Sequence, residues 1–265
     1  METTIASVLG PNGDDGAHGV GVRHLNCGDT AFSVEFGTAI DPAINAKVMG
    51  LHAAIKAEAA AGRLPGVVET VPSFRALLVH YDPLRTSRVA LEPAIDALAA
   101  QGRSATTEGR RWRIPCCYDD PELAPDLPEV AERTRLTASQ VVALHSGAEF
   151  TVYVVGFMPG FPFMGGLPKA LELPRRKQPR VAVPQSSVAI ALVMTGIYPW
   201  ESPGGWHLIG RTPLQMFDPR RAQPSLFGPA DRVRFRAIAR AEFDALASQQ
   251  KAGTLDAATF FEAPP

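Results

Sequence analysis

Cysteine is scarce in this chain of 265 residues, and the few cysteines are not arranged like a cluster of ligands. The three are Cys27 and the adjacent pair Cys116 and Cys117, which form no CxxC motif and no metal-ligand spacing with the six histidines. We therefore expect no metal site in this chain. The cysteines are interpreted as reduced thiols, which are typical of a cytoplasmic protein.

Long apolar runs and a strong net charge are also missing. No stretch of about eighteen uninterrupted apolar residues occurs, and the N-terminus lacks the basic and apolar regions of a secretory signal. The formal net charge is -1, with 46% hydrophobic and 20% charged residues. This composition predicts a globular cytoplasmic protein that has neither nucleic acid nor membrane as a partner.

The familiar nucleotide and catalytic motifs are absent from the sequence. It contains no P-loop, no GxGxxG that opens a helix after a strand, no GxSxG and no HExxH. An ATP site of a familiar kind is therefore not expected within this chain.

The first part of the chain alternates strand-like and helical patterns. Residues 1–18 are small, polar and rich in glycine, which predicts a disordered tail. Residues 19–103 predict two strands within 20–37, a helix capped by Asp41, strands at 67–71 and 76–81, and a helix at 87–100. Helices that all pack on one side of the strands indicate a ferredoxin-like α+β domain.

The second part, residues 110–245, is mostly strand and turn. A strand within 110–119 precedes a short helix within 121–135 and a second helix at Thr137, whose capping-box partner is Gln140. Further strands are predicted at 152–155, 181–183, 188–193, 207–210, 214–217 and 233–235. Many short strands with tight turns predict a closed or nearly closed barrel. After a helical start at 241–250, residues 246–265 are expected to form a peripheral tail.

A basic run at 174–180, with the sequence PRRKQPR, is the first candidate for chemistry. Two prolines stiffen the backbone around Arg175, Arg176 and Arg180, and the planar guanidinium group suits a carboxylate or a phosphate. The alternative is a solvated run of charge.

A second motif, GFMPGFPFMGG at 156–166, contains Phe157, Phe161, Phe163 and Met164. Such a loop either packs as a hydrophobic hairpin or forms a partner surface or the apolar wall of a pocket.

The third motif, TGIYPWESPGGWHLIGRTP at 195–213, combines glycines with aromatic and polar residues. Backbone amides of Gly204 and Gly205 could approach an anionic or carbonyl group, whereas the aromatic residues of the motif could equally fill the barrel. Its candidate substrate-binding and catalytic residues are Tyr198, Gly204, Gly205, Trp206, Arg211 and Thr212. His145, just before the strand that opens this region, either caps a helix or acts as a proton carrier.

Several of these segments together resemble one family. The motifs at 156–167, 173–180, 183–191 and 195–213, together with GPADRVRF at 228–235, look like those of the 5-oxoprolinase B subunit, allophanate hydrolase subunit 1 and the KipI protein. The resemblance implies an N-terminal α+β domain and a C-terminal cyclophilin-like β-barrel. The chain differs from the usual family pattern at Gln185, Ser186, Leu192 and Met194, so its ligand could differ as well.

The resemblance implies one component of an ATP-dependent 5-oxoprolinase, which opens 5-oxoproline to L-glutamate. This B subunit would act with a cyclophilin-like C subunit and a separate A subunit, and ATP would bind at the level of the complex. The cations Arg175, Arg176, Arg180 and Arg211 would bind a substrate carboxylate, with His145 as a proton carrier or orienting donor. Two alternatives are a urea carboxyltransferase-type protein and a KipI-like inhibitor of a sensor histidine kinase.

Overall fold

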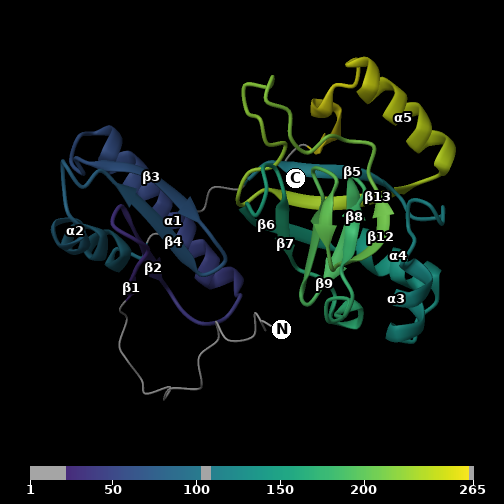
Figure 1. Cartoon of the computed structure of the whole chain (residues 1–265), viewed down its shortest axis with the longest axis horizontal. Helices are drawn as coiled ribbons and strands as arrows, with labels where there is room; N and C mark the ends of the chain where they lie inside the picture. The colour runs from purple at the N-terminus through teal and green to yellow at the C-terminus, as the bar shows by residue number, and fades with distance from the viewer. Residues whose placement is uncertain (1–21, 103–108, 263–265) are drawn as a thin grey trace.

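A computed structural model describes residues 22–102 and 109–262, which form two domains that lie side by side (Figure 1). The predicted tail at 1–18 and the domain boundary after residue 103 lie outside the described residues. The N-terminal domain consists of β1 (Arg23–Asn26), β2 (Ala31–Glu35), α1 (Pro42–Ala60), β3 (Val67–Pro72), β4 (Ala76–Tyr81) and α2 (Arg88–Ala100).

The N-terminal sheet has the strand order β1-β2-β4-β3, with every neighbouring pair antiparallel. This is the ferredoxin-like order, with β1 in the position that the last strand takes in that fold. The side chain of Asp41 accepts hydrogen bonds from the amides of Ala43 and Ile44 and so caps α1 as predicted. Both helices cover one face of the sheet, where Ile55 of α1 and Ile95 of α2 are fully buried.

The C-terminal domain is a barrel closed by seven strands. They are β5 (Arg111–Cys117), β6 (Glu149–Val155), β7 (Pro162–Gly165), β9 (Ser187–Ala191), β10 (Met194–Ile197), β12 (His207–Arg211) and β13 (Arg232–Ile238). Their order is β12-β9-β10-β7-β6-β13-β5, and the pair Arg211 and Cys117 joins β12 back to β5. The predicted fold class, an α+β domain followed by a β-barrel, is confirmed.

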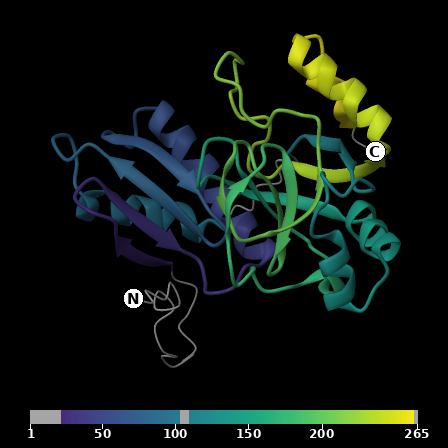
Figure 2. The ribbon, with the colours of Figure 1, turned by 45° about the vertical axis from the view of Figure 1, so that its right-hand side comes forward.

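Helices and a small ribbon surround this barrel. The helices are α3 (Leu127–Thr134), α4 (Ala138–Gly147) and α5 (Arg240–Ala252), with short 3₁₀ helices at Lys169–Leu171 and Ala257–Phe260. Strands β8 (Arg180–Val183) and β11 (Ser202–Gly204) form a separate two-stranded ribbon. The capping box of Thr137 and Gln140 begins α4 as predicted. Figures 1 and 2 show α5 at one end of the barrel and α3 and α4 at the other.

Three local predictions in the barrel domain are wrong. Residues 214–217 are not a strand, because Phe217 makes only an isolated bridge to Ser225. The predicted strand at 188–193 ends at Ala191, because Leu192 turns the chain with a left-handed φ of 54°. Residues 246–262 are no peripheral tail, since α5 continues to Ala252 and β14 (Phe261–Glu262) pairs with β5.

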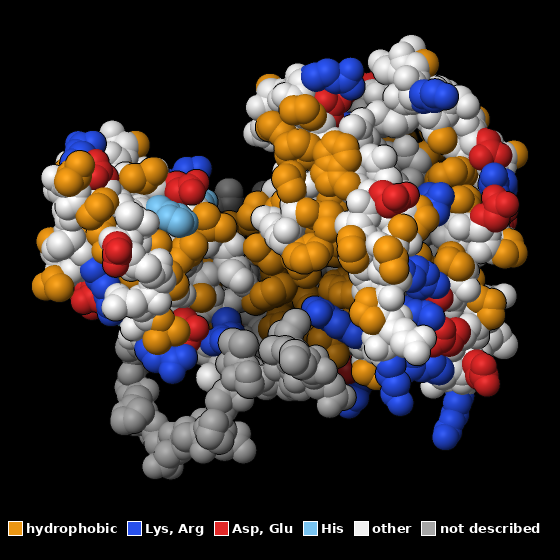
Figure 3. Space-filling model, in the orientation of Figure 1, with side chains coloured by type: hydrophobic (Ala, Val, Ile, Leu, Met, Phe, Trp, Pro, Cys, Tyr) orange, Lys and Arg blue, Asp and Glu red, His pale blue; other side chains and the backbone are white. Residues whose placement is uncertain are grey.

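An aromatic contact joins the two domains. Phe74, at the turn between β3 and β4, packs edge-on against Tyr153 and Phe163 of the barrel, with ring centroids 6.0 and 5.8 Å apart. Asn45 of α1 fixes this turn by donating hydrogen bonds to the carbonyl oxygens of Ser73 and Phe74. Figure 3 shows hydrophobic side chains gathered on the part of the barrel that faces the N-terminal domain.

Across the described residues, the helices are too short or too polar to cross a bilayer. The same residues hold no group of three or more His, Cys, Asp or Glu side chains that could bind a metal ion.

Candidate functional site

The basic run is held by carboxylates of α3 and of the residue that precedes it. Arg176 Nη1 donates to Asp126 Oδ1 at 2.9 Å and to Glu129 Oε2 at 2.6 Å, and Arg180 Nη1 donates to Asp126 Oδ2 at 2.8 Å. The Asp126 side chain is only 4% exposed and also accepts the amide of Leu208 at 2.7 Å. Arg176 and Arg180 therefore anchor the loop to α3 and are not free cations for a substrate.

Arg175 differs from its neighbours in the run. Its side chain is exposed and makes no ion pair with any residue that the structure describes. It lies near the buried Tyr198, whose pKa is raised mainly by burial and is lowered by a hydrogen bond with the backbone of Trp206 and then by the charges of Arg175 and Arg180. The structure thus keeps only one of the three predicted arginines available at this end of the barrel.

His145 lies inside the barrel and has no exposed surface. Its Nε2 is 2.9 Å from the hydroxyl of Thr195, which donates to the carbonyl of Ala189, so Nε2 carries the proton and donates. Its Nδ1 then accepts from the hydroxyl of Tyr118 at 2.8 Å. Burial lowers the pKa of His145 to about 3. The predicted catalytic role does not fit a neutral, enclosed imidazole whose two nitrogens are both occupied.

The aromatic candidates mostly fill the domain. Tyr198, Trp206 and Phe161 are at most 5% exposed, and Tyr198 and Trp206 each pack edge-on against Phe161. A Cβ atom added at Gly204 would lie 2.4 Å from the Tyr198 hydroxyl oxygen, so packing against this ring requires glycine there. The carbonyl of Gly205 accepts a hydrogen bond from the amide of Arg176 at 2.7 Å, which gives this residue a structural role as well.

Only one of the four predicted interface residues presents its side chain to solvent. Phe157 is 77% exposed and has a left-handed φ of 71°, a conformation that is unusual for a bulky residue. Phe161 and Met164 are buried in the barrel, and Phe163 is half-buried against Phe74. The sequence could not distinguish these positions, because all four lie in the same Gly- and Pro-rich segment.

A polar pocket of about 380 Å³ brings Arg211 and Thr212 together. We call it the Arg211 pocket. It lies where β12 ends, between the turn that precedes β9 and the helix α5. Its lining consists of Gln185, Ser186, Arg211, Thr212, Pro213, Gln215, Arg220, Phe243, Ala247, Gln250 and Lys251. The last four residues belong to α5, which the sequence had not linked to any site.

The charges of the Arg211 pocket suit an anion. Arg211 is half-buried, makes no hydrogen bond or ion pair with another described side chain, and its buried Nε lacks a partner. Burial, followed by the charge of Arg240, lowers the pKa of Arg211 from its ordinary value. An arginine side chain nevertheless stays charged at neutral pH. Lys251 adds a second cation, whereas Arg220 is paired with Asp218 at 2.8 Å. A small carboxylate or phosphate would therefore gain a charge-assisted partner here.

Ser186 shapes the rim of the Arg211 pocket. It has a left-handed φ of 63°, the conformation for which glycine is the usual residue. Its amide donates to the carbonyl of Tyr198 at 2.7 Å, and its hydroxyl donates to the carbonyl of Leu214 at 2.8 Å. The hydroxyl of Thr212 accepts the amide of Leu214 at 3.3 Å and keeps its own hydrogen available as a donor.

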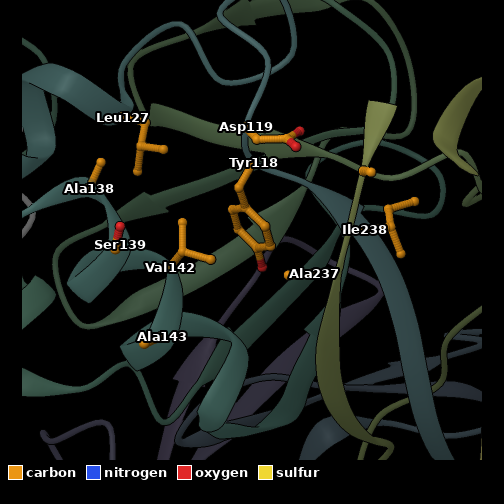
Figure 4. Close-up of a pocket in the computed structure, with 10 residues that line it drawn as sticks. Tyr118, Asp119, Leu127, Ala138, Ser139, Val142, Ala143, Ala237 and Ile238 are labelled. Carbon is orange, nitrogen blue, oxygen red and sulfur yellow. The ribbon is translucent and has the colours of Figure 1, made fainter. Parts of the chain in front are cut away.

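A second, larger cavity of about 530 Å³ is mostly apolar (Figure 4). Leu127 of α3, Val142 of α4 and Ile238 of β13 contribute to its lining, and Tyr118 projects between them. Its charged group is Asp119, which accepts a hydrogen bond from the Cys117 thiol at 3.0 Å. Because a carboxylate repels an anion, this cavity suits a carboxylate substrate less well than the Arg211 pocket does.

Comparison with known proteins identifies the family of this chain. Residues 22–227 match the family described as carboxyltransferase domain, subdomain C and D, and the chain belongs to that family. It is 36% identical to the 5-oxoprolinase B subunit of Bacillus subtilis, an alignment that covers 82% of this chain and 93% of the relative.

Two solved structures extend the comparison. The structure of TTHA0988 is 39% identical over 78% of this chain, with a TM-score of 0.69, and this chain spans only 40% of that longer one. The Kluyveromyces lactis urea amidolyase is 20% identical over 91% of this chain and 16% of its own length, with a TM-score of 0.72. The second likeness demonstrates a common fold.

Proposed function

We propose that this chain is the B subunit of an ATP-dependent 5-oxoprolinase, which opens 5-oxoproline to L-glutamate together with a C subunit and an A subunit. The observation that carries the proposal is the alignment with the Bacillus subtilis B subunit over 93% of that protein's length. Because the sequence contains no familiar nucleotide motif, the proposal assigns ATP to the complex and not to this chain.

The Arg211 pocket supports this function through its charge. 5-Oxoproline carries one carboxylate next to its lactam ring, and the guanidinium group of Arg211 is a planar partner for such a group. Lys251 would add attraction, and the hydroxyl of Thr212, which also lines the pocket, would donate to a second oxygen. In the proposed reaction ATP phosphorylates the lactam oxygen and leaves as ADP, water adds to the lactam carbon, and the ring C–N bond breaks to give γ-glutamyl phosphate. A second water then hydrolyses this acyl phosphate to glutamate and phosphate.

The test is reconstitution of the complex from its purified components. We expect formation of glutamate from 5-oxoproline that requires ATP and stops when this chain is left out. If the mixture instead requires biotin and acts on urea, a carboxyltransferase-type role is the better assignment. If no combination forms glutamate while this chain inhibits the autophosphorylation of a histidine kinase, the binding-protein alternative replaces the proposal.

Substitution of Arg211 tests the pocket within that assay. Arg211→Gln should raise the KM for 5-oxoproline by about 10- to 100-fold, because one charge-assisted hydrogen bond contributes about 1.5–3 kcal/mol. Arg211→Lys keeps the charge and should recover part of this loss. Arg63→Gln, on the 63% exposed side chain of Arg63 in the N-terminal domain, is the matched control. An unchanged KM in the folded Arg211→Gln complex would show that the substrate carboxylate does not bind in this pocket.

A further inference from the structure

The outer face of the adjacent strands β5 and β13 carries a set of arginines that no step of the proposed reaction uses. We call this set the arginine stripe. It consists of Arg111 and Arg113 of β5 and Arg232, Arg234 and Arg236 of β13. The residues between them point inward, since Trp112, Ile114, Val233 and Phe235 are buried in the barrel core. The alternation of the two strands therefore places every arginine of the stripe on the outside.

The register of the two strands sets like charges opposite each other. β5 and β13 are parallel, with Arg232 opposite Arg111 and Arg234 opposite Arg113. Neighbouring strands are about 4.8 Å apart, and like charges directly opposite on a sheet destabilise it. Neutral residues at these outward positions would leave the buried core unchanged. The arginines of the stripe therefore repel one another except where a carboxylate offsets their charge.

Carboxylates of this chain already contact the stripe from its edges. Glu149 of β6 pairs with Arg234 at 3.2 Å, and Glu242 of α5 pairs with Arg236 at 2.6 Å. Arg113, which is 60% exposed, has a long contact of 3.8 Å to Glu262 of β14. In each of these pairs one side-chain carboxylate contacts one arginine of the stripe.

Arg232 lies at the exposed end of the stripe. Its side chain donates to the hydroxyl of Thr151, and no carboxylate pairs with it among residues 22–102 and 109–262. Together with the weakly held Arg113, it leaves guanidinium donors open to a second molecule.

We propose that the arginine stripe is a docking surface for an extended acidic segment of another polypeptide. Alternate residues of a strand are about 6.6 Å apart, which is also the spacing of alternate acidic side chains in an extended segment. Each guanidinium fork can bind a carboxylate through two parallel hydrogen bonds. Because the chain has a formal net charge of -1, the attraction is local to this face.

A nucleic acid fits the same surface less well. Single strands are usually bound with exposed aromatic rings between the cations, whereas Trp112 and Phe235 of these two strands point into the core. The proposal therefore commits to an acidic polypeptide.

The experiment measures binding of a fluorescein-labelled decapeptide of alternating Glu and Thr to the full chain by fluorescence anisotropy. The comparison probes are the matching Gln and Thr peptide and a single-stranded RNA of ten nucleotides. The test variant is Arg113→Gln with Arg232→Gln, which removes one member of each like-charge pair. The control variant is Arg23→Gln with Arg63→Gln, which removes two arginines that are 66% and 63% exposed on the other domain.

We expect the acidic peptide to bind more tightly than the Gln peptide and to bind the stripe variant about tenfold more weakly, with the control variant unchanged. The Tm of the stripe variant should not fall, because repulsion is removed. Equal binding of both peptides, or equal loss in both variants, would overturn the proposal. Tighter binding of the RNA through the same arginines would also overturn it, as would a Tm lowered by several degrees, which indicates a structural role.

Discussion

Removal of the Asp126 carboxylate should destabilise the chain far more than removal of an exposed acid. Its side chain is 4% exposed and accepts hydrogen bonds from Arg176, Arg180 and the amide of Leu208. Asp126→Ala would leave two guanidinium groups, each 25% exposed, without their shared partner. Breaking a buried ion pair by deleting one partner costs about 3–5 kcal/mol. For a chain of this size that loss corresponds to a Tm lowered by about 6–20 °C.

The assay is urea unfolding followed by tryptophan fluorescence, since Trp206 and Trp112 are both buried. The control is Glu242→Gln, which breaks an ion pair between the exposed side chains of Glu242 and Arg236 and should cost less than about 1 kcal/mol. A loss below about 1 kcal/mol for Asp126→Ala would refute the reasoning. In the reconstituted enzyme, Arg176→Gln should likewise lower stability. A raised KM for 5-oxoproline at unchanged stability would instead indicate that Arg176 binds the substrate.

Two further predictions concern buried groups. Burial holds the pKa of His145 at about 3 in the folded state, whereas the value in the unfolded chain is about 6.5. Between these pH values His145 is protonated in the unfolded chain and neutral in the folded one. The free energy of unfolding should then fall by about 1.4 kcal/mol for each pH unit between 6.5 and 3, and urea titrations in His145→Gln should lack this part of the slope. Gly204→Ala should cost about 1–3 kcal/mol, because its Cβ meets the Tyr198 hydroxyl. Tyr198→Phe should recover part of that loss, and strictly additive effects of the two substitutions in thermal melts would contradict the clash.

Elements with local signals could be predicted from the sequence. The caps at Asp41 and Thr137 begin helices where the pattern places them, because a cap and its amides lie within three residues of each other. Strand β7 was missed, since its residues lie in a segment dense in glycine and proline that is typical of a loop. It exists because β6 and β10 pair with it on both sides, and the sequence does not reveal which strands will be neighbours.

The candidate site was harder to predict for the same reason. The basic run indicates an anion partner, and it has one, but the partner is Asp126, 50 residues before Arg176 in the chain. A short motif carries no information on a contact at that separation. The Arg211 pocket was predicted in part, because Arg211 and Thr212 do lie in it, whereas Lys251 and Phe243 come from α5, beyond the motifs that the sequence analysis used.

The substitutions at Ser186 and Leu192 alter the site in a specific way. The resemblance places glycine at both positions, and both keep a left-handed backbone, with φ of 63° and 54°. The cost of that conformation is offset by hydrogen bonds, which for Ser186 include its hydroxyl to Leu214 and for Leu192 its amide to the carbonyl of Leu173 at 2.6 Å. The turns therefore keep their shape, and what changes at the Arg211 pocket is a side chain at its rim. If this protein selects a substrate other than 5-oxoproline, Ser186 and its neighbour Gln185 are the positions where the selection would arise, because they line the pocket without forming its cationic centre.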